Sequence, residues 1–339
     1  MKNLLLPLIA GIALISCDRS TKDNTEASVK QVPAFSLSNL DTTVSPCDDF
    51  YHYAIGGWLR DNLIPSTESR WSSFNVVTDS NNAKLKKIFN EFSAKEFEKG
   101  SIEQKIGDFY KSVLDSTTAE YRGLEPLDRL LTELDEVSTM EDYVELTSSW
   151  RQFGISSFSN LYIGQDDKNS SEYITFLSQG GLGLPDVSYY TKSDEKAVEI
   201  QNAYKDFLVN ILSLAQAENP EKAAITIFNM EKSLAEISMT RVERRDPELT
   251  YNKLSFSELQ KLTSEINWGS QFSLIGLNNV QNVVVGQPNF FKGLNKMLKD
   301  IPVSDWKVYS RWKLIDAYAS NLSSEFVNAN FDFFGKMLS

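Results

Sequence analysis

The sequence offers few side chains that could act as a nucleophile or as a base. It contains two cysteines, Cys17 and Cys47, and a single histidine, His52. Cys47 and His52 both lie in the stretch "SPCDDFYHYAIGGWLRDNLIPSTESRWSSF", residues 45–74. A cysteine nucleophile needs a base beside it, but enzymes of this kind usually bring the two groups together from distant parts of the chain. We therefore interpret Cys47 as a buried thiol and His52 as a surface or helix-capping residue.

Motifs for metal and nucleotide chemistry are absent from the sequence. A His-Glu-x-x-His helix presents two imidazoles to one zinc ion while its glutamate activates water, and a single histidine cannot assemble that site. The Gly-x-Ser-x-Gly, P-loop and Gly-x-Gly-x-x-Gly patterns are also missing. We predict no catalytic residue and no metal ligand in this chain.

Two further features could be mistaken for sites. The segment "GGLGLPD", residues 180–186, lacks the lysine and the helix start of a phosphate-binding loop, so it favours a tight turn. The acidic pairs Asp48–Asp49 and Asp166–Asp167 could bind a cation, but adjacent side chains on regular structure point apart. We interpret both pairs as helix caps or solvated side chains.

The N-terminus has the pattern of an export signal. Lys2 precedes an apolar run over residues 4–15 that ends in "LISC". This run is too short to remain a membrane span, and small residues before a cysteine are typical of a bacterial lipoprotein signal. We predict a lipoprotein signal peptide over residues 1–16 and lipidation of Cys17, which would hold an exported protein on the periplasmic or cell-surface side of a membrane through lipid alone. An ordinary signal peptide with an incidental cysteine, or a short apolar anchor, are the alternatives.

The polar composition of residues 17–44 predicts a flexible tether, because such a segment cannot bury enough apolar surface to offset its ordering entropy. Residues 45–339 are numerous enough for a large core or two subdomains. The net charge of −12, without a long basic run, disfavours nucleic acid as a partner. With Cys17 lipidated, Cys47 has no cysteine left for an intrachain disulfide.

Hydrophobic periodicity predicts that helices carry most of the core. The helices are expected over residues 82–99, 127–137, 140–154, 193–218 and 304–334, with another from Pro220. Capping signals support three starts, at Ser101 with Gln104, at Thr139, and at Ser255 with Glu258. Short runs near Leu161, from Tyr173 and from Asn282 predict strands, the first two pairing as a hairpin across "QDDKNSSE". The predicted fold is mainly α, with a few short β-strands.

Several motifs together resemble a known family. In order they are the stretch over residues 46–74 quoted above, "FYKSVLD" from Phe109, "GLEPL" from Gly123, "QGGLGLPDVSYY" from Gln179, "RRDPELTYNKLS" from Arg244, "VVVGQPNFF" from Val283 and "WKVYSRWKLIDAYASNLSSEF" from Trp306. They resemble the neprilysin and endothelin-converting-enzyme family of zinc metallopeptidases, whose bacterial members are often secreted or lipid-anchored. The likeness covers residues 45–339.

The resemblance implies a large helical N-terminal lobe that closes over a thermolysin-like C-terminal lobe and limits access to small peptides. In that family the zinc ligands, the glutamate base and the transition-state histidine belong to the later lobe, and this sequence stops at "FFGKMLS" before any of them. We therefore expect residues 45–339 to form the N-terminal helical domain without the catalytic domain. Zinc would belong to the complete family enzyme and would not be bound by this chain.

The resemblance also gives Arg70 a role. An arginine after the "IP...S" turn in neprilysin-like enzymes pairs with the free carboxylate of bound peptides, and Arg70 in "IPSTESRWSSF" holds the matching place. A guanidinium suits this role because its fork can donate two parallel hydrogen bonds. The alternative is a surface arginine paired with Glu68 or Asp61. The neighbouring aromatics Phe50, Tyr51, Tyr53 and Trp58 are interpreted as core, and "GGW" as a site of close backbone approach.

Two function hypotheses follow. In the first, the chain is the cleft-capping and substrate-selecting part of a lipid-anchored zinc metalloendopeptidase, inactive alone, whose partners are peptide substrates and a missing or separately encoded catalytic lobe. In the second, it is a free-standing, non-catalytic lipoprotein that binds peptides or a protein partner. In the family, the sequence pattern of this lobe extends further than "FFGKMLS", which favours the first hypothesis.

Overall fold

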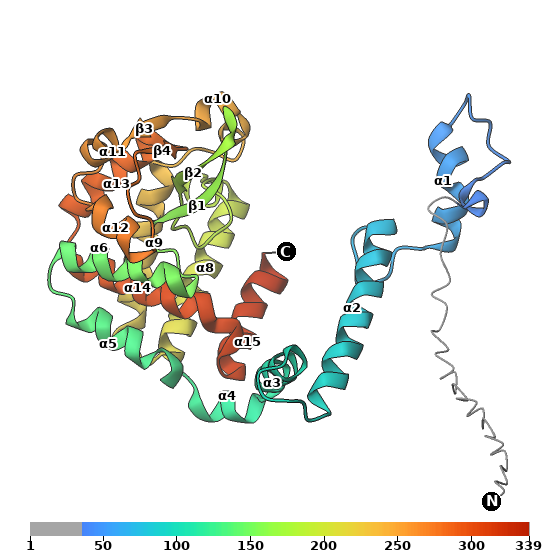
Figure 1. Ribbon diagram of the computed structural model, residues 1–339, viewed down its shortest axis with the longest axis horizontal. Helices are drawn as coiled ribbons and strands as arrows, with labels where there is room; N and C mark the ends of the chain where they lie inside the picture. Colours follow the sequence, from blue (N-terminus) through green and yellow to red (C-terminus); the bar gives the residue numbers. More distant parts are fainter. Residues whose placement is uncertain (1–35, 339) are drawn as a thin grey trace, which may run out of the picture. The chain divides into compact units, whose positions relative to one another are not determined.

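The structure is a computed structural model that describes residues 36–338. The predicted signal peptide and Cys17 lie outside the described residues. The chain divides after Ile88 into two compact units, and each unit is described by itself below. Figure 1 shows the helices and strands with their labels.

The first unit is built on a helix that is crossed closely by the segment before it. It contains η1 (Leu37–Asn39), α1 (Phe50–Asp61) and most of α2 (Ser73–Ser93). A side chain at Gly57 would place its Cβ 2.1 Å from the Ser38 carbonyl oxygen, so only glycine permits this approach. The Asp41 N–H also donates to the Tyr53 carbonyl at 2.9 Å. Ser38 and Asp41, near the end of the segment predicted to be a tether, therefore lie close to α1.

Three residues of the first unit differ from expectation in their exposure. Phe50 and Tyr51 are 68% and 60% exposed, so their interpretation as core is wrong. Cys47, expected to be a buried thiol, is exposed. These residues lie at or just before the start of α1, and the described residues of the first unit leave them exposed.

The second unit is mainly helical, as the sequence predicts. Its α-helices are α3 (Ile102–Leu114), α4 (Ser116–Arg122), α5 (Asp128–Glu136), α6 (Met140–Ser149), α7 (Ser188–Thr191), α8 (Glu195–Leu214), α9 (Pro220–Glu236), α10 (Pro247–Thr250), α11 (Phe256–Leu262), α12 (Trp268–Leu274), α13 (Pro288–Asp300), α14 (Val303–Tyr318) and α15 (Ser324–Asn330). Shorter turns are the 3-10 segments η2 (Glu125–Leu127), η3 (Trp150–Phe153), η4 (Glu243–Arg245) and η5 (Ala319–Asn321), and the π-helical segment η6 (Phe331–Met337).

Local capping signals located the starts of α3, α6, α9 and α11. The capping boxes of Thr139 and of Ser255 with Glu258 are both formed, and Asn219 caps α9 ahead of Pro220. At Ser101 the hydroxyl accepts the Gln104 N–H. These caps were predictable because each joins residues only three positions apart.

Two helical predictions were wrong in extent. The helix expected over residues 82–99 is α2, Ser73–Ser93, which begins nine residues earlier. The single helix expected over 304–334 is divided into α14, η5, α15 and η6, because Leu322 and Ser323 adopt extended backbone angles between the helical pieces. Periodicity cannot detect such a break when apolar residues continue on both sides of it.

A small four-stranded sheet accompanies the helices. Its strands are β1 (Ser159–Asp166), β2 (Asn169–Gln179), β3 (Lys253–Ser255) and β4 (Asn282–Val285), in the order β1-β2-β4-β3. β1 and β2 form the predicted antiparallel hairpin, with a tighter turn than expected, and β4 pairs parallel to β2. The sequence did not reveal β3, which pairs antiparallel to β4.

One large apolar core holds the second unit together. α9 packs against both α8 and α14, and Trp150, Trp306 and Trp312 are completely buried in this core. Burial of side chains this large is the main stabilising contribution available to the unit. The core therefore fixes the elements that carry the polar clusters described next.

Candidate functional site

Arg70 lies in the loop between α1 and α2, and its side chain is exposed. Within residues 36–338 it forms no ion pair with Glu68 or Asp61, and Asp61 instead faces the Arg60 Nε at 3.7 Å. Its guanidinium is thus available to a ligand. The substrate-binding role of Arg70 stays a prediction, because no bound peptide tests it.

Cys47 and His52 do not form a catalytic pair in the described chain. The His52 Nδ1 lies 2.6 Å from an oxygen of Asp49, and the His52 backbone N–H donates to the same carboxylate at 3.0 Å. These bonds, the backbone one first, hold the pKa of Asp49 below its usual value. His52 is therefore an exposed residue in the first turn of α1, and Asp49 is the N-cap of that helix. This confirms the interpretation of His52 as a surface residue.

The described residues do not fit a zinc ion. Over residues 36–338 no group of three or more histidine, cysteine, aspartate or glutamate side chains is arranged to hold a metal. The sole histidine of the chain is bound to Asp49, and zinc sites of peptidases need imidazole or thiolate ligands beside a carboxylate. No step of metal chemistry can be assigned to these residues.

A buried carboxylate at the centre of the second unit was missed by sequence reasoning. Glu231 on α9 has no exposed surface, and its carboxylate accepts hydrogen bonds from the Tyr190 hydroxyl at 2.7 Å, the Tyr204 hydroxyl at 2.8 Å and the Trp312 indole N–H at 3.3 Å. Burial raises the pKa of Glu231 above its ordinary value, although Lys313 opposes the shift. A glutamate within the apolar face of α9 was the available signal.

This cluster anchors the glycine-rich segment "GGLGLPD". The Tyr190 hydroxyl, which donates to Glu231, accepts the backbone N–H groups of Gly183 and Leu184 at 3.2 and 2.8 Å. A Cβ at Gly183 would lie 2.0 Å from the Tyr204 hydroxyl. Gly181 has a φ of +92°, which glycine adopts without strain. The segment is thus a turn, as predicted, held by buried tyrosines.

A second polar cluster corrects the interpretation of Asp166. This residue is only 1% exposed, and its carboxylate accepts the Tyr251 hydroxyl at 2.6 Å, the Lys253 ammonium at 2.7 Å and the Lys168 backbone N–H at 2.9 Å. The hydrogen bond from Lys253, then that from Tyr251, holds the pKa of Asp166 far below its usual range. Asp166 is a buried ion-pair partner that joins the β1–β2 turn to β3, not a solvated side chain.

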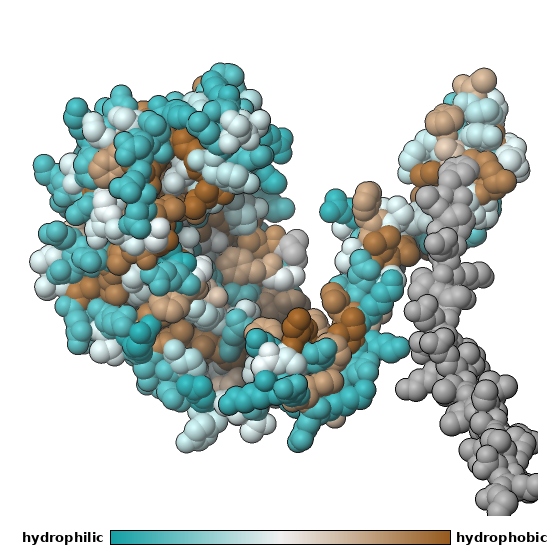
Figure 2. Space-filling view, viewed as in Figure 1, coloured by the Kyte–Doolittle hydropathy of each residue, from teal (hydrophilic) through white to brown (hydrophobic). Residues whose placement is uncertain are grey.

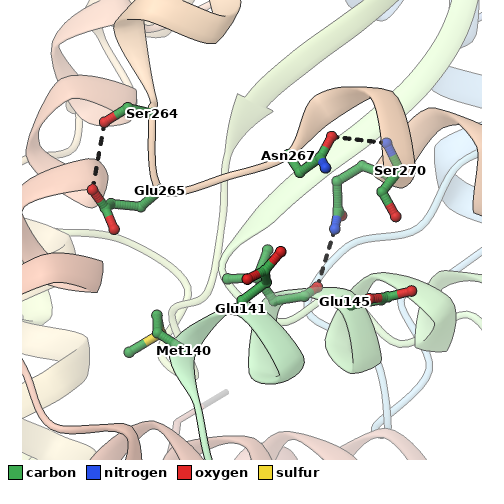
Figure 3. A pocket seen from close by; sticks show the side chains of 9 residues that line it. Met140, Glu141, Glu145, Ser264, Glu265, Asn267 and Ser270 are labelled. Carbon is green, nitrogen blue, oxygen red and sulfur yellow. Dashed lines mark hydrogen bonds between the residues drawn. The ribbon is translucent and has the colours of Figure 1, made fainter.

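Figure 3 shows a hollow with acidic walls between α6 and the segment before α12. Its cavity volume is about 260 Å³, and Glu141, Glu145 and Glu265 line it. The Glu265 carboxylate accepts the Ser264 hydroxyl, and Asn267 caps α12 through the Ser270 N–H. The three glutamates do not form a metal-binding group among the described residues. We assign no chemistry to this hollow.

Known proteins resemble this chain in sequence and in fold. The sequence profile of peptidase family M13 matches residues 46–339. Neprilysin from Homo sapiens is 30% identical over 320 residues, which cover 85% of this chain and 42% of that protein. Endothelin-converting enzyme 1 from Bos taurus is 27% identical over 346 residues, covering 96% of this chain and 45% of that protein.

A solved structure shows the same fold. The crystal structure of the Mycobacterium tuberculosis zinc metalloprotease ZMP1 in complex with an inhibitor superposes with a TM-score of 0.80 at 28% sequence identity, over 90% of this chain and 47% of that one. A mainly helical region with a small mixed sheet, similar in fold and sequence to a zinc metalloprotease, places the chain in the class of metallopeptidase-related proteins.

The chain belongs to peptidase family M13 and represents the N-terminal region of that family. It spans less than half the length of the curated relatives described above.

Proposed function

We propose that this chain is the cleft-capping and substrate-selecting part of a zinc metalloendopeptidase that acts on small peptides. The observation that carries the proposal is the family match over residues 46–339, which accounts for less than half of each relative. Since the described residues lack a donor set for zinc, the metal and the catalytic groups would come from a second region that packs with this one.

Uncovered apolar surface supports a second region as partner. Large apolar side chains are exposed in the first unit, at Phe50, Tyr51, Leu63, Ile64, Phe74, Val76, Val77, Leu85 and Ile88. On α3, the face predicted to be apolar is exposed at Ile102, Phe109 and Val113. Figure 2 shows brown apolar atoms at the surface of α2 and α3. Large exposed apolar patches mark interaction sites in soluble proteins, so the exposed apolar residues of each unit are candidates for contact with a further region.

Export and lipid anchoring complete the proposal. The support is the sequence pattern that ends in Cys17, which lies outside the described residues. Within residues 36–338 no helix is long and apolar enough to cross a bilayer. Replacing Cys17 with serine should release the protein from the membrane fraction if lipid is the anchor, and continued membrane association would exclude that anchor.

The experiment for the main proposal begins with the DNA beyond the last codon. An in-frame or adjacent region encoding His-Glu-x-x-His should, when expressed together with this chain, cleave peptides in a zinc-dependent and chelator-sensitive way. The chain alone should not cleave. Cleavage by the purified chain alone would overturn the proposal, and absence of such a region across related genomes would favour a free-standing binding lipoprotein.

Arg70 is proposed to pair with the terminal carboxylate of the peptide substrate. In the completed enzyme, Arg70→Ala should raise KM for peptides with a free C-terminal carboxylate by roughly 10-fold or more, because it removes charge-assisted hydrogen bonds. Amidated peptides should be unaffected. The matched control is Arg60→Ala, which removes another exposed arginine of the same unit. An equal loss for both peptides, or for both variants, would contradict the role.

A further inference from the structure

A small pocket lies over the glycine-rich segment of the second unit. It is lined by residues 179–185, Ser156, Asn160, Ser238, Arg244 and Lys313, and its cavity volume is about 360 Å³. We call it the glycine-loop pocket. The volume is at the lower end of the range for ligand sites, so it would take a group about the size of one amino-acid residue.

Two cations reach the glycine-loop pocket from distant parts of the chain. Lys313 comes from α14 and its side chain is 12% exposed, while Arg244 comes from η4. Among residues 36–338, no aspartate or glutamate lines the pocket. Arg244 forms no ion pair with any residue in the described range 36–338, so its guanidinium has donors to offer. The sequence lacked a lysine beside the glycines, and the tertiary fold supplies one.

The backbone of the pocket adds further donors. The N–H groups of Gly181 and Leu182 donate to no acceptor within residues 36–338, whereas the next two N–H groups are taken by the Tyr190 hydroxyl. Gly181 has a positive φ, and consecutive free N–H groups around such a residue are a recurrent anion-binding arrangement in proteins. The Asn160 amide nitrogen, in contrast, is occupied by the Gln179 carbonyl at 2.9 Å.

The charges behind the pocket limit which anion it can take. The Asp316 carboxylate lies 3.6 Å from the Lys313 ammonium, and the buried Glu231 carboxylate lies behind Gly183. These acids offset part of the positive potential from Lys313. A singly charged ligand therefore fits better than a doubly charged phosphate, and the planar fork of Arg244 matches the two oxygens of a carboxylate.

We propose that the glycine-loop pocket binds the carboxylate of a ligand about one residue in size, with Arg244, Lys313 and the N–H groups of Gly181 and Leu182 as donors. The source could be a free small carboxylate or the C-terminal residue of a peptide. The pocket belongs to the second unit and Arg70 to the first, and the proposal does not depend on zinc or on proteolysis.

The test is calorimetric titration of the full chain with four probes: N-acetyl-alanine, N-acetyl-alaninamide, a longer peptide ending in alanine with a free carboxylate, and inorganic phosphate. N-acetyl-alanine should bind and its amide should bind at least about 10-fold more weakly, because the amide loses the charge-assisted bonds. If the longer peptide binds as tightly as N-acetyl-alanine, the pocket accepts the C-terminal residue of a peptide. If the longer peptide does not bind, the ligand is a free small carboxylate.

Variants localise the binding. Arg244→Gln should weaken binding about 10-fold. The matched control Arg245→Gln, in the adjacent exposed arginine outside the pocket lining, should leave it unchanged. Lys313→Gln should also weaken binding, and thermal unfolding of this variant would show whether it is still folded. Binding of phosphate but not of carboxylates, equal binding of acid and amide, or equal effects of the two arginine variants would overturn the proposal.

Discussion

The buried carboxylate of Glu231 gives a stability prediction that depends on pH. We consider the replacement Glu231→Gln, which keeps the shape of the side chain but removes its charge and turns one acceptor atom into a donor. Two tyrosine hydroxyls donate to one carboxylate oxygen, and the Trp312 indole N–H faces the other at 3.3 Å. If the glutamine carbonyl oxygen accepts the two tyrosine hydroxyls, its NH₂ group must face the Trp312 indole N–H, and two donors then meet.

The expected cost at low pH follows from that mismatch. A lost bond that leaves a buried donor without an acceptor costs about 1–3 kcal/mol. Glu231 is protonated at low pH and has no charge to lose, so the variant should be less stable than the wild type by roughly that amount near pH 4.

The sign of the pH dependence comes from the raised pKa. Burial makes the folded-state pKa of Glu231 higher than the unfolded value of about 4.3, so the folded state holds more protons between these two values. The stability of the wild type therefore falls, for this group, as pH rises from the unfolded pKa through the folded one. A difference of one in pKa between the folded and unfolded states corresponds to about 1.36 kcal/mol of stability, which the glutamine variant does not lose. The deficit of the variant should thus shrink, or reverse, between pH 4 and pH 8.

Urea unfolding of the full chain at several pH values would measure this difference. The control is Glu199→Gln, because Glu199 is an exposed glutamate on the neighbouring helix α8. Its stability difference from the wild type should stay small at every pH. A deficit for Glu231→Gln that is constant with pH, or that grows toward pH 8, would refute the conclusion that burial dominates the pKa of this group.

Two further predictions concern packing and the second polar cluster. Gly183→Ala should lower the free energy of unfolding by about 1–3 kcal/mol, because its Cβ would lie 2.0 Å from a buried phenol oxygen. The control Gly269→Ala, with no atom nearer than 3.4 Å, should change it much less in the same chemical denaturation assay. Asp166→Asn should lower the melting temperature at pH 7 through loss of the ion pair with Lys253. Since the folded-state pKa of Asp166 is depressed, the wild-type advantage exists above the unfolded pKa of about 3.9 and should diminish as pH falls below it, and equal melting temperatures at pH 7 would contradict this.

The fold class and several helix starts could be predicted from the sequence because their signals are local. Thr139, Asn219 and Ser255 each accept a backbone N–H three residues later, so the capping residue and its partner occur in one short stretch. The β1–β2 hairpin was predictable for the same reason. β3 was missed because three residues carry too little pattern, and they become a strand only by pairing with β4.

Exposure was predicted less well than secondary structure. Phe50 and Tyr51 are aromatic residues of the kind that form cores, but burial requires another element packed on them, and the described residues of the first unit leave both exposed. The same limit applies to Arg70, whose role depends on a ligand. A local pattern states which side chains favour burial, and it does not state what covers them.

The sequence by itself determined the family, the helical architecture and the lack of a His-Glu-x-x-His motif, because these depend on residue types and short spacings. Only the tertiary structure decided which polar groups meet. Asp166 and Lys253 lie 87 positions apart, and Lys313, on α14, lines the same pocket as glycines far from it in the sequence. Such contacts form where helices and strands pack around a common core, and no local spacing encodes that packing.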